Sequence, residues 1–111
     1  MKLVKDIKLV RDLIPRIIEE QGGKCDSRTV HGVDEHLVFL RVKMIEEVNE
    51  FIVDPSYEEA ADMLEVLKAF CSLNNLDFDI VISTAQSKQE ERGGFGRGVI
   101  LQESRGFGEC S

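Results

Sequence analysis

The 111-residue sequence lacks several features that would assign it to a particular protein class. It has no apolar run of about 18 residues, which argues against a membrane-spanning helix, and its first residues lack the long apolar stretch of a signal peptide. The three cysteines, Cys25, Cys71 and Cys110, are odd in number and widely spaced, so they form neither a disulfide framework nor a CxxC metal knuckle. We therefore expect a cytoplasmic protein with no membrane partner.

Basic residues are also scarce, because 14 Lys and Arg face 21 Asp and Glu, for a net charge of −7. Nucleic-acid polymers and anionic membranes are polyanions, so this balance argues against both as partners. The length allows one domain, which we expect to span residues 1–111 with a core over 8–103 and a frayed tail over 104–111. A chain this short buries only about two-thirds of its unfolded surface, so association with a second copy would stabilise it.

The negative charge is concentrated in one part of the chain. Residues 46–65 hold eight acids and no Lys or Arg, and the rest of the chain, with 13 acids and 14 bases, is close to neutral. An anionic substrate would need a bound cation or a local basic patch in such a region. The eight acids are Glu46, Glu47, Glu50, Asp54, Glu58, Glu59, Asp62 and Glu65.

The two central segments have the periodicity of long helices. Apolar residues recur at steps of three and four from residue 37 to residue 52 and again from 60 to 73. Asp54-Pro55-Ser56 separates the two runs, with either Asp54 or Ser56 as the cap of the second helix. Asn74-Asn75 ends that helix. The pattern predicts a helical hairpin.

Two shorter helices are expected on either side of this hairpin. The first lies within residues 8–21, with Asp12 as N-cap, Pro15 in the first turn and Gly22-Gly23 as the stop. The last runs from Asp77 or Asp79 to Arg92 and ends at Gly93-Gly94. Residues 25–30 and 99–103 have weak strand character and would pair as a two-stranded ribbon. We predict an all-α fold that becomes four-helix-bundle-like on oligomerisation.

The acids of the hairpin lie beside its apolar stripes. At about 100° per residue, Glu47 falls at the border of the first stripe and Glu59 points with the core-facing side chains of the second helix. Spacings of three and four residues put Glu46, Glu47 and Glu50 on one side of one helix, and Glu59 and Asp62 on one side of the other. An ionised carboxylate in such a place is costly unless it is paired or coordinated. Together the five acids favour a site for Mg²⁺, with Mn²⁺ as a possible substitute.

Each acid also has a simpler interpretation. Glu59 follows Ser56 by three residues and fits the second half of a capping box, while Glu46 and Glu50 fit a solvated helix face. Lys43 and Lys68, one turn before and after the cluster, would pair with some of the acids. Taken singly, the acids favour these interpretations, and taken together they favour the metal site.

A second candidate site lies at the end of the last helix. Lys88 and Arg92 continue its apolar face, and the guanidinium of Arg92 with the backbone N–H groups of Gly93-Gly94 suits phosphate oxygens. The alternative is that both bases complement the helix dipole.

These residues resemble one family. Glu46-Glu47-x-x-Glu50 followed by Glu59-x-x-Asp62 is similar to the metal-binding signature of the all-α nucleoside triphosphate pyrophosphohydrolases, the MazG-like and phosphoribosyl-ATP pyrophosphohydrolase-like group. Residues 8–15 (KLVRDLIP) and 88–95, with Lys88-x-x-x-Arg92-Gly93-Gly94-Phe95, look like a compact house-cleaning branch of that group. The resemblance covers about residues 8–103. Only residues 51–58 separate the two halves of the signature, which is shorter than is usual for MazG proteins.

The resemblance implies hydrolysis of a nucleotide between its α and β phosphates, with release of pyrophosphate. Metal ligands would be Glu47, Glu50, Glu59 and Asp62. Glu46 would bind a second metal or act as the catalytic base that deprotonates the attacking water. Lys88 and Arg92 would bind the leaving pyrophosphate, with Lys8 and Arg11 as further phosphate candidates. Family members assemble as dimers or tetramers, so a homo-oligomer is expected.

Two other classes of function remain open at this stage. One is a catalytically silent helical scaffold that binds a nucleotide or a protein in the same groove. The other is an acidic dimerisation module with no ligand, which leaves the position of Glu59 on an apolar face unexplained. The base, the sugar, the choice between a nucleoside triphosphate and a phosphoribosyl nucleotide, and the number of metals are also open.

Overall fold

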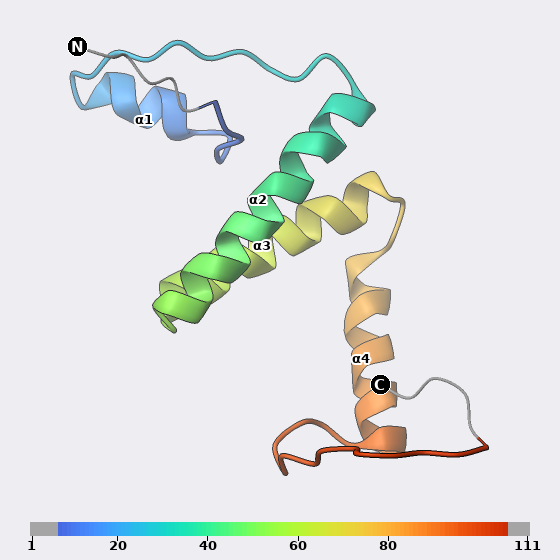
Figure 1. Ribbon diagram of the computed structural model, residues 1–111. Helices are drawn as coiled ribbons and strands as arrows, with labels where there is room; N and C mark the ends of the chain where they lie inside the picture. Colours follow the sequence, from blue (N-terminus) through green and yellow to red (C-terminus); the bar gives the residue numbers. More distant parts are fainter. Residues whose placement is uncertain (1–6, 107–111) are drawn as a thin grey trace. The chain divides into compact units, whose positions relative to one another are not determined.

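The fold is all-α. A computed structural model describes residues 7–106, which form four helices and no strand. The helices are α1 (Ile14–Glu20), α2 (Val33–Val53), α3 (Tyr57–Leu73) and α4 (Phe78–Arg92) (Figure 1). Contacts divide the chain into two units, one ending at Phe78 and one beginning at Asp79, and each is described by itself. None of the described helices has both the length and the apolar character needed to cross a membrane.

The predicted helical hairpin is formed by α2 and α3, the two helices that pack against each other within residues 7–106. After Val53 the chain turns through Asp54-Pro55-Ser56, and α3 runs back along α2 (Figure 1). Of the two predicted caps, Ser56 is the one used, because its Oγ accepts a hydrogen bond of 3.2 Å from the backbone N–H of Glu59. The turn brings the acidic halves of the two helices close together.

Two of the predicted stops have the geometry of a Schellman motif. At the end of α1, Gly22 has a φ of +84°, and the N–H of Gly23 donates to the carbonyl of Ile18 at 2.9 Å. At the end of α3, Asn75 has a φ of +59°, and the N–H of Leu76 donates to the carbonyl of Cys71 at 2.9 Å. Glycine and asparagine adopt this left-handed conformation more readily than other residues do, so both helices end where the sequence predicts.

The predicted N-cap of α1 is wrong. Leu13, not Asp12, is the N-cap residue, and no side chain caps the helix. The N–H of Ile14 donates to the carbonyl of Arg11 at 3.1 Å, so the chain makes a turn over residues 11–14 before the helix starts. Pro15 does lie in the first turn, where its missing N–H costs nothing.

Residues 25–30 and 99–103 form no strand in the described structure. They belong to different units, so their pairing as a ribbon stays a prediction. The expected stop of α4 is present, because Gly93 has a φ of +81° and its N–H donates to the carbonyl of Gln89 at 2.8 Å. The expectation of a frayed tail over residues 104–111 falls mostly outside the described residues.

The buried core of the described chain is small. Leu40 on α2 and Cys71 on α3 are its buried apolar side chains, at 2% and 5% exposure. Leu37, Met44 and Phe51 are half-buried. The residues that widen the predicted stripe of α2 are 54–70% exposed, and they are Val38, Val42, Ile45 and Ile52. The hairpin therefore keeps an uncovered apolar surface.

Candidate metal centre

Glu47 is the most unusual side chain of the hairpin. It lies in the middle of α2 and is only 4% exposed, which is rare for a carboxylate. One of its oxygens, Oε1, lies 3.2 Å from the ammonium of Lys43, one helical turn earlier. The other, Oε2, is buried without a hydrogen-bond partner. Half of a buried carboxylate is thus uncompensated.

Burial raises the pKa of Glu47 above its ordinary value, and the neighbouring Glu50 adds to the rise. The hydrogen bond and the charge of Lys43 act in the opposite direction and lower the pKa of Glu47. Burial alone would lower the pKa of Lys43, but its hydrogen bonds to Glu47 and Glu46 outweigh that effect and leave the pKa raised. The Lys43 side chain is 18% exposed, so this cation is held largely inside the hairpin.

The five predicted acids come together in two groups that share Glu47. Glu46, Glu47 and Glu50 form the first group along α2, and Glu47, Glu59 and Asp62 form the second between α2 and α3. Within each group one oxygen from every residue lies within 4.8 Å of the others. Oxygens from several carboxylates at such distances suit a hard divalent cation.

Glu59 shows how the capping and metal interpretations combine. The hydroxyl of Ser56 accepts a hydrogen bond from the backbone N–H of Glu59, which is the first half of the capping box; the second half, with the Glu59 side chain as acceptor, stays a prediction. Its side-chain Oε2, however, is buried and without a hydrogen-bond partner, like Oε2 of Glu47. The cap therefore leaves at least one carboxylate oxygen of Glu59 uncompensated beside Glu47 and Asp62.

Two basic side chains touch the acidic groups. Lys43 lies 3.3 Å from Oε1 of Glu46 as well as 3.2 Å from Glu47. Arg11, in the segment before α1, places Nη2 at 2.7 Å from Oδ1 of Asp62. The pairing of Lys43 was expected from its spacing. The Arg11–Asp62 contact joins residues 51 positions apart, and no pattern in the sequence indicates it.

The remaining predicted bases are Lys68, Lys8, Lys88 and Arg92. Lys68 is near Glu65, at 3.9 Å, rather than in either acidic group. Lys8 is an exposed residue before α1. Lys88 and Arg92 are exposed on α4, in the unit that begins at Asp79, so their relation to the acidic groups stays a prediction.

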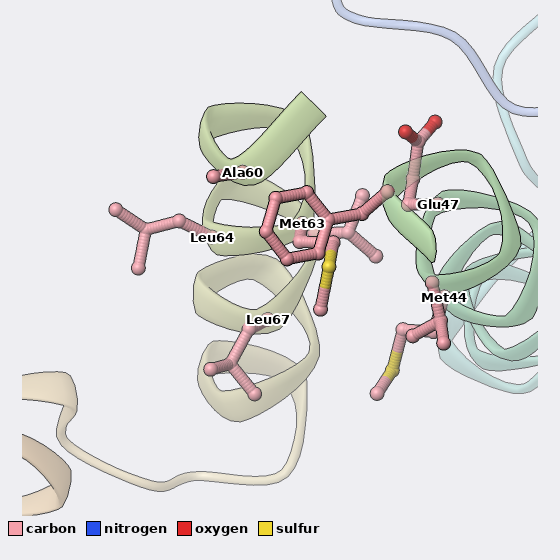
Figure 2. A pocket seen from close by; sticks show the side chains of 9 residues that line it. Met44, Glu47, Ala60, Met63, Leu64 and Leu67 are labelled. Carbon is pink, nitrogen blue, oxygen red and sulfur yellow. The ribbon is translucent and has the colours of Figure 1, made fainter. Parts of the chain in front are cut away.

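An apolar groove of about 300 Å³ adjoins the acidic groups. Figure 2 shows Met44 and Glu47 on α2 and Met63 on the side of α3 nearer to them, while Leu64 projects from the other side of α3. Among the described residues that line the groove, Glu47 is the charged one. The lining residues are Met44, Glu47, Val48, Phe51, Ala60, Met63, Leu64, Val66 and Leu67.

Comparisons of the chain with protein-family models, curated proteins and solved structures found no match.

Proposed function

We propose that this chain is a metal-dependent nucleotide pyrophosphohydrolase. It would hydrolyse a nucleoside triphosphate or a related nucleotide between the α and β phosphates and release pyrophosphate. The proposal rests on two buried oxygens without hydrogen-bond partners, Oε2 of Glu47 on α2 and Oε2 of Glu59 on α3. Both residues belong to the same cluster of acids, which Asp62 completes.

The charges at the site support a bound cation. Lys43 and Arg11 contact Glu46, Glu47 and Asp62, and the five carboxylates carry more negative charge than these two bases supply. A buried polar atom that lacks a partner costs about 1–3 kcal/mol, and more when it is charged. A divalent cation would remove this cost at both oxygens at once. Oxygen-only ligands favour Mg²⁺, and Mn²⁺ accepts the same donors.

The residues present fit such an ion. Glu47, Glu50, Glu59 and Asp62 would hold it, with Glu47 common to both groups. When bound, the ion supplies Lewis-acid chemistry and neutralises phosphate charge. The similarity of Glu46-Glu47-x-x-Glu50 and Glu59-x-x-Asp62 to the signature of the MazG-like pyrophosphohydrolases supports the same assignment.

Glu46 is the proposed catalytic base. Its side chain is 32% exposed, so it keeps access to water while its neighbour Glu47 is buried. It would take a proton from a water molecule whose oxygen attacks phosphorus. The bond between the α phosphorus and the bridging oxygen breaks, and a monophosphate and pyrophosphate result. Lys88 and Arg92 are proposed to bind the pyrophosphate; a second metal at Glu46 is the alternative role for this residue.

The uncovered apolar surface supports a homo-oligomer. Val38, Val42, Ile45 and Ile52 are all more than half exposed on one helix, and contiguous apolar patches of this kind mark interfaces. We propose a dimer or tetramer built on the α2–α3 hairpin, in the cytoplasm.

Pyrophosphate release from a panel of canonical and modified nucleoside triphosphates, with Mg²⁺ or Mn²⁺, tests the proposal. The native protein is expected to release pyrophosphate, and Glu50→Gln to lose at least about a hundredfold of that rate, the scale of a lost catalytic interaction. Glu58→Gln is the matched control, because Glu58 is an exposed acid of α3 outside both groups. If no variant releases pyrophosphate from any substrate, the catalytically silent scaffold is the better account.

A further inference from the structure

The ion pair between Arg11 and Asp62 connects the segment before α1 to the acidic site. Nη2 of Arg11 lies 2.7 Å from Oδ1 of Asp62, and Asp62 belongs to the group that contains both unpartnered oxygens. The guanidinium thus already acts as a cation for Asp62, one of the four carboxylates proposed to hold a metal.

The two cations of the site are held very differently. Lys43 is 18% exposed and its partner Glu47 is 6% exposed at the side chain, so this pair is shielded from water. Arg11 and Asp62 are 56% and 39% exposed. Exposed ion pairs are weak, because water and salt screen them and because ordering two side chains costs entropy. Arg11 is therefore the cation that can leave easily.

From this contrast we propose that Arg11 is an exchangeable counter-cation. It neutralises Asp62 while no divalent ion is bound, and it is displaced when one binds at Glu47, Glu59 and Asp62. The inference rests on the metal site of the proposed function. A divalent ion repels the guanidinium whichever oxygen of Asp62 it contacts, so the two compete even if Arg11 keeps one oxygen.

Displacement gives Arg11 a second role. Once Arg11 has left Asp62, the N–H donors of its guanidinium are available beside the metal-binding acids. Guanidinium groups bind phosphate oxygens in a bidentate manner. The same side chain would then move from a carboxylate to a phosphate of the bound nucleotide. Metal binding would thereby prepare the site for its anionic substrate.

The test is a titration of the full chain with Mn²⁺ in the absence of nucleotide, read by electron paramagnetic resonance. Arg11→Gln is expected to bind Mn²⁺ about twofold to fivefold more tightly than the native protein, the factor that an exposed ion pair is worth. Arg16→Gln is the matched control. Arg16 forms an exposed ion pair with Glu20 inside α1, at 2.8 Å against 2.7 Å for Arg11 and Asp62. Arg16→Gln therefore removes the same charge without affecting Asp62. Its Mn²⁺ affinity should equal that of the native protein.

A second titration, with inorganic pyrophosphate at saturating Mn²⁺, tests the second role. Arg11→Gln should bind pyrophosphate at least about threefold more weakly, again the scale of one exposed charge pair, while Arg16→Gln should not change. Arg11→Met, which keeps the aliphatic stem and removes the charge, replaces Arg11→Gln if circular dichroism shows that the latter is unfolded.

The outcomes separate this inference from the proposed function. If the native protein binds Mn²⁺ and neither Arg11 variant binds it more tightly, the exchange is wrong and the metal site stands. Tighter Mn²⁺ binding with unchanged pyrophosphate binding leaves Arg11 as a competitor only and refutes its transfer to phosphate. If the native protein binds no Mn²⁺ at millimolar concentration and also releases no pyrophosphate, the exchange and the proposed function both fall.

Discussion

The ammonium of Lys43 lies 3.2 Å from Oε1 of Glu47, and the other oxygen of the same buried carboxylate has no hydrogen-bond partner. The spacing of one helical turn makes the pair local, and burial of both side chains shields it from water. Without a metal, Lys43 is the cation that holds Glu47 inside the hairpin.

Lys43→Met should therefore destabilise the metal-free protein substantially. Removing one member of a buried pair leaves the other charge uncompensated, and we expect a loss of about 2–4 kcal/mol in the free energy of unfolding by urea. Lys68→Met is the control, because Lys68 and its neighbour Glu65 are about half exposed and 3.9 Å apart. It should lose less than about 1 kcal/mol. Equal losses in the two variants would contradict the buried-pair account.

Glu47→Gln should be tolerated better, because Lys43 keeps Glu46 as a partner at 3.3 Å after this change. Because burial raises the pKa of Glu47, the ionised carboxylate is a net cost in the metal-free fold. The variant should be as stable as the native protein or more stable, within about 1 kcal/mol. Millimolar Mn²⁺ should raise the melting temperature of the native protein and leave that of Glu47→Gln unchanged. A Mn²⁺-induced rise of the same size in both would show that the ion binds elsewhere.

The carboxylate of Glu35 supports the beginning of α2 and gives the hairpin a defined acid sensitivity. Hydrogen bonds from the Arg28 guanidinium, at 2.8 Å, and from the backbone N–H of His31, at 2.9 Å, lower the pKa of Glu35 from 4.5 to about 2. A lowered folded-state pKa contributes stability that is fully present above pH 4.5 and is lost as the pH falls toward 2.

Urea unfolding at a series of pH values checks this. Glu35→Gln should be less stable than the native protein above pH 4.5, and the difference should shrink as the pH falls toward 2. Asp34→Asn, an exposed neighbour in the same first turn, is the control and should keep the native pH dependence. A pH-independent difference for Glu35→Gln would mean that its carboxylate charge does not matter.

The cap of α3 positions Glu59 and has its own test. Ser56→Ala removes the oxygen that accepts the N–H of Glu59 and should cost about 1 kcal/mol of unfolding free energy, whereas Ser56→Gly should cost only a few tenths. Mn²⁺ affinity should fall with Ser56→Ala, because the first turn of α3 carries Glu59 and is followed by Asp62. Unchanged stability in Ser56→Ala would refute the importance of the cap.

Much of this arrangement follows from local sequence. Pro55 and Ser56 separate the two helices, and Gly22 and Asn75 end helices because they accept a positive φ. The five acids are close together because helical spacing aligns them within each helix and a tight turn brings the helices together.

Other features depend on contacts that no local pattern carries. Asp12 is a good capping residue by type, but the turn from Arg11 to Ile14 puts the start of α1 beyond its reach. Arg11 and Asp62 are brought together by the fold across 51 residues, so a sequence pattern indicates neither partner for the other. Spacing therefore predicts the acids of the site, whereas Arg11 is expected there only from the family resemblance, as a phosphate candidate, and its pairing with Asp62 is not predicted.

The proposed hydrolysis is checked by product analysis of the native protein with a nucleoside triphosphate, with and without Mg²⁺ or Mn²⁺. We expect nucleoside monophosphate and pyrophosphate in equal amounts, formed only when the divalent cation is present and lost in Glu50→Gln. Formation of a diphosphate and inorganic phosphate, or the same products without any divalent cation, would contradict it.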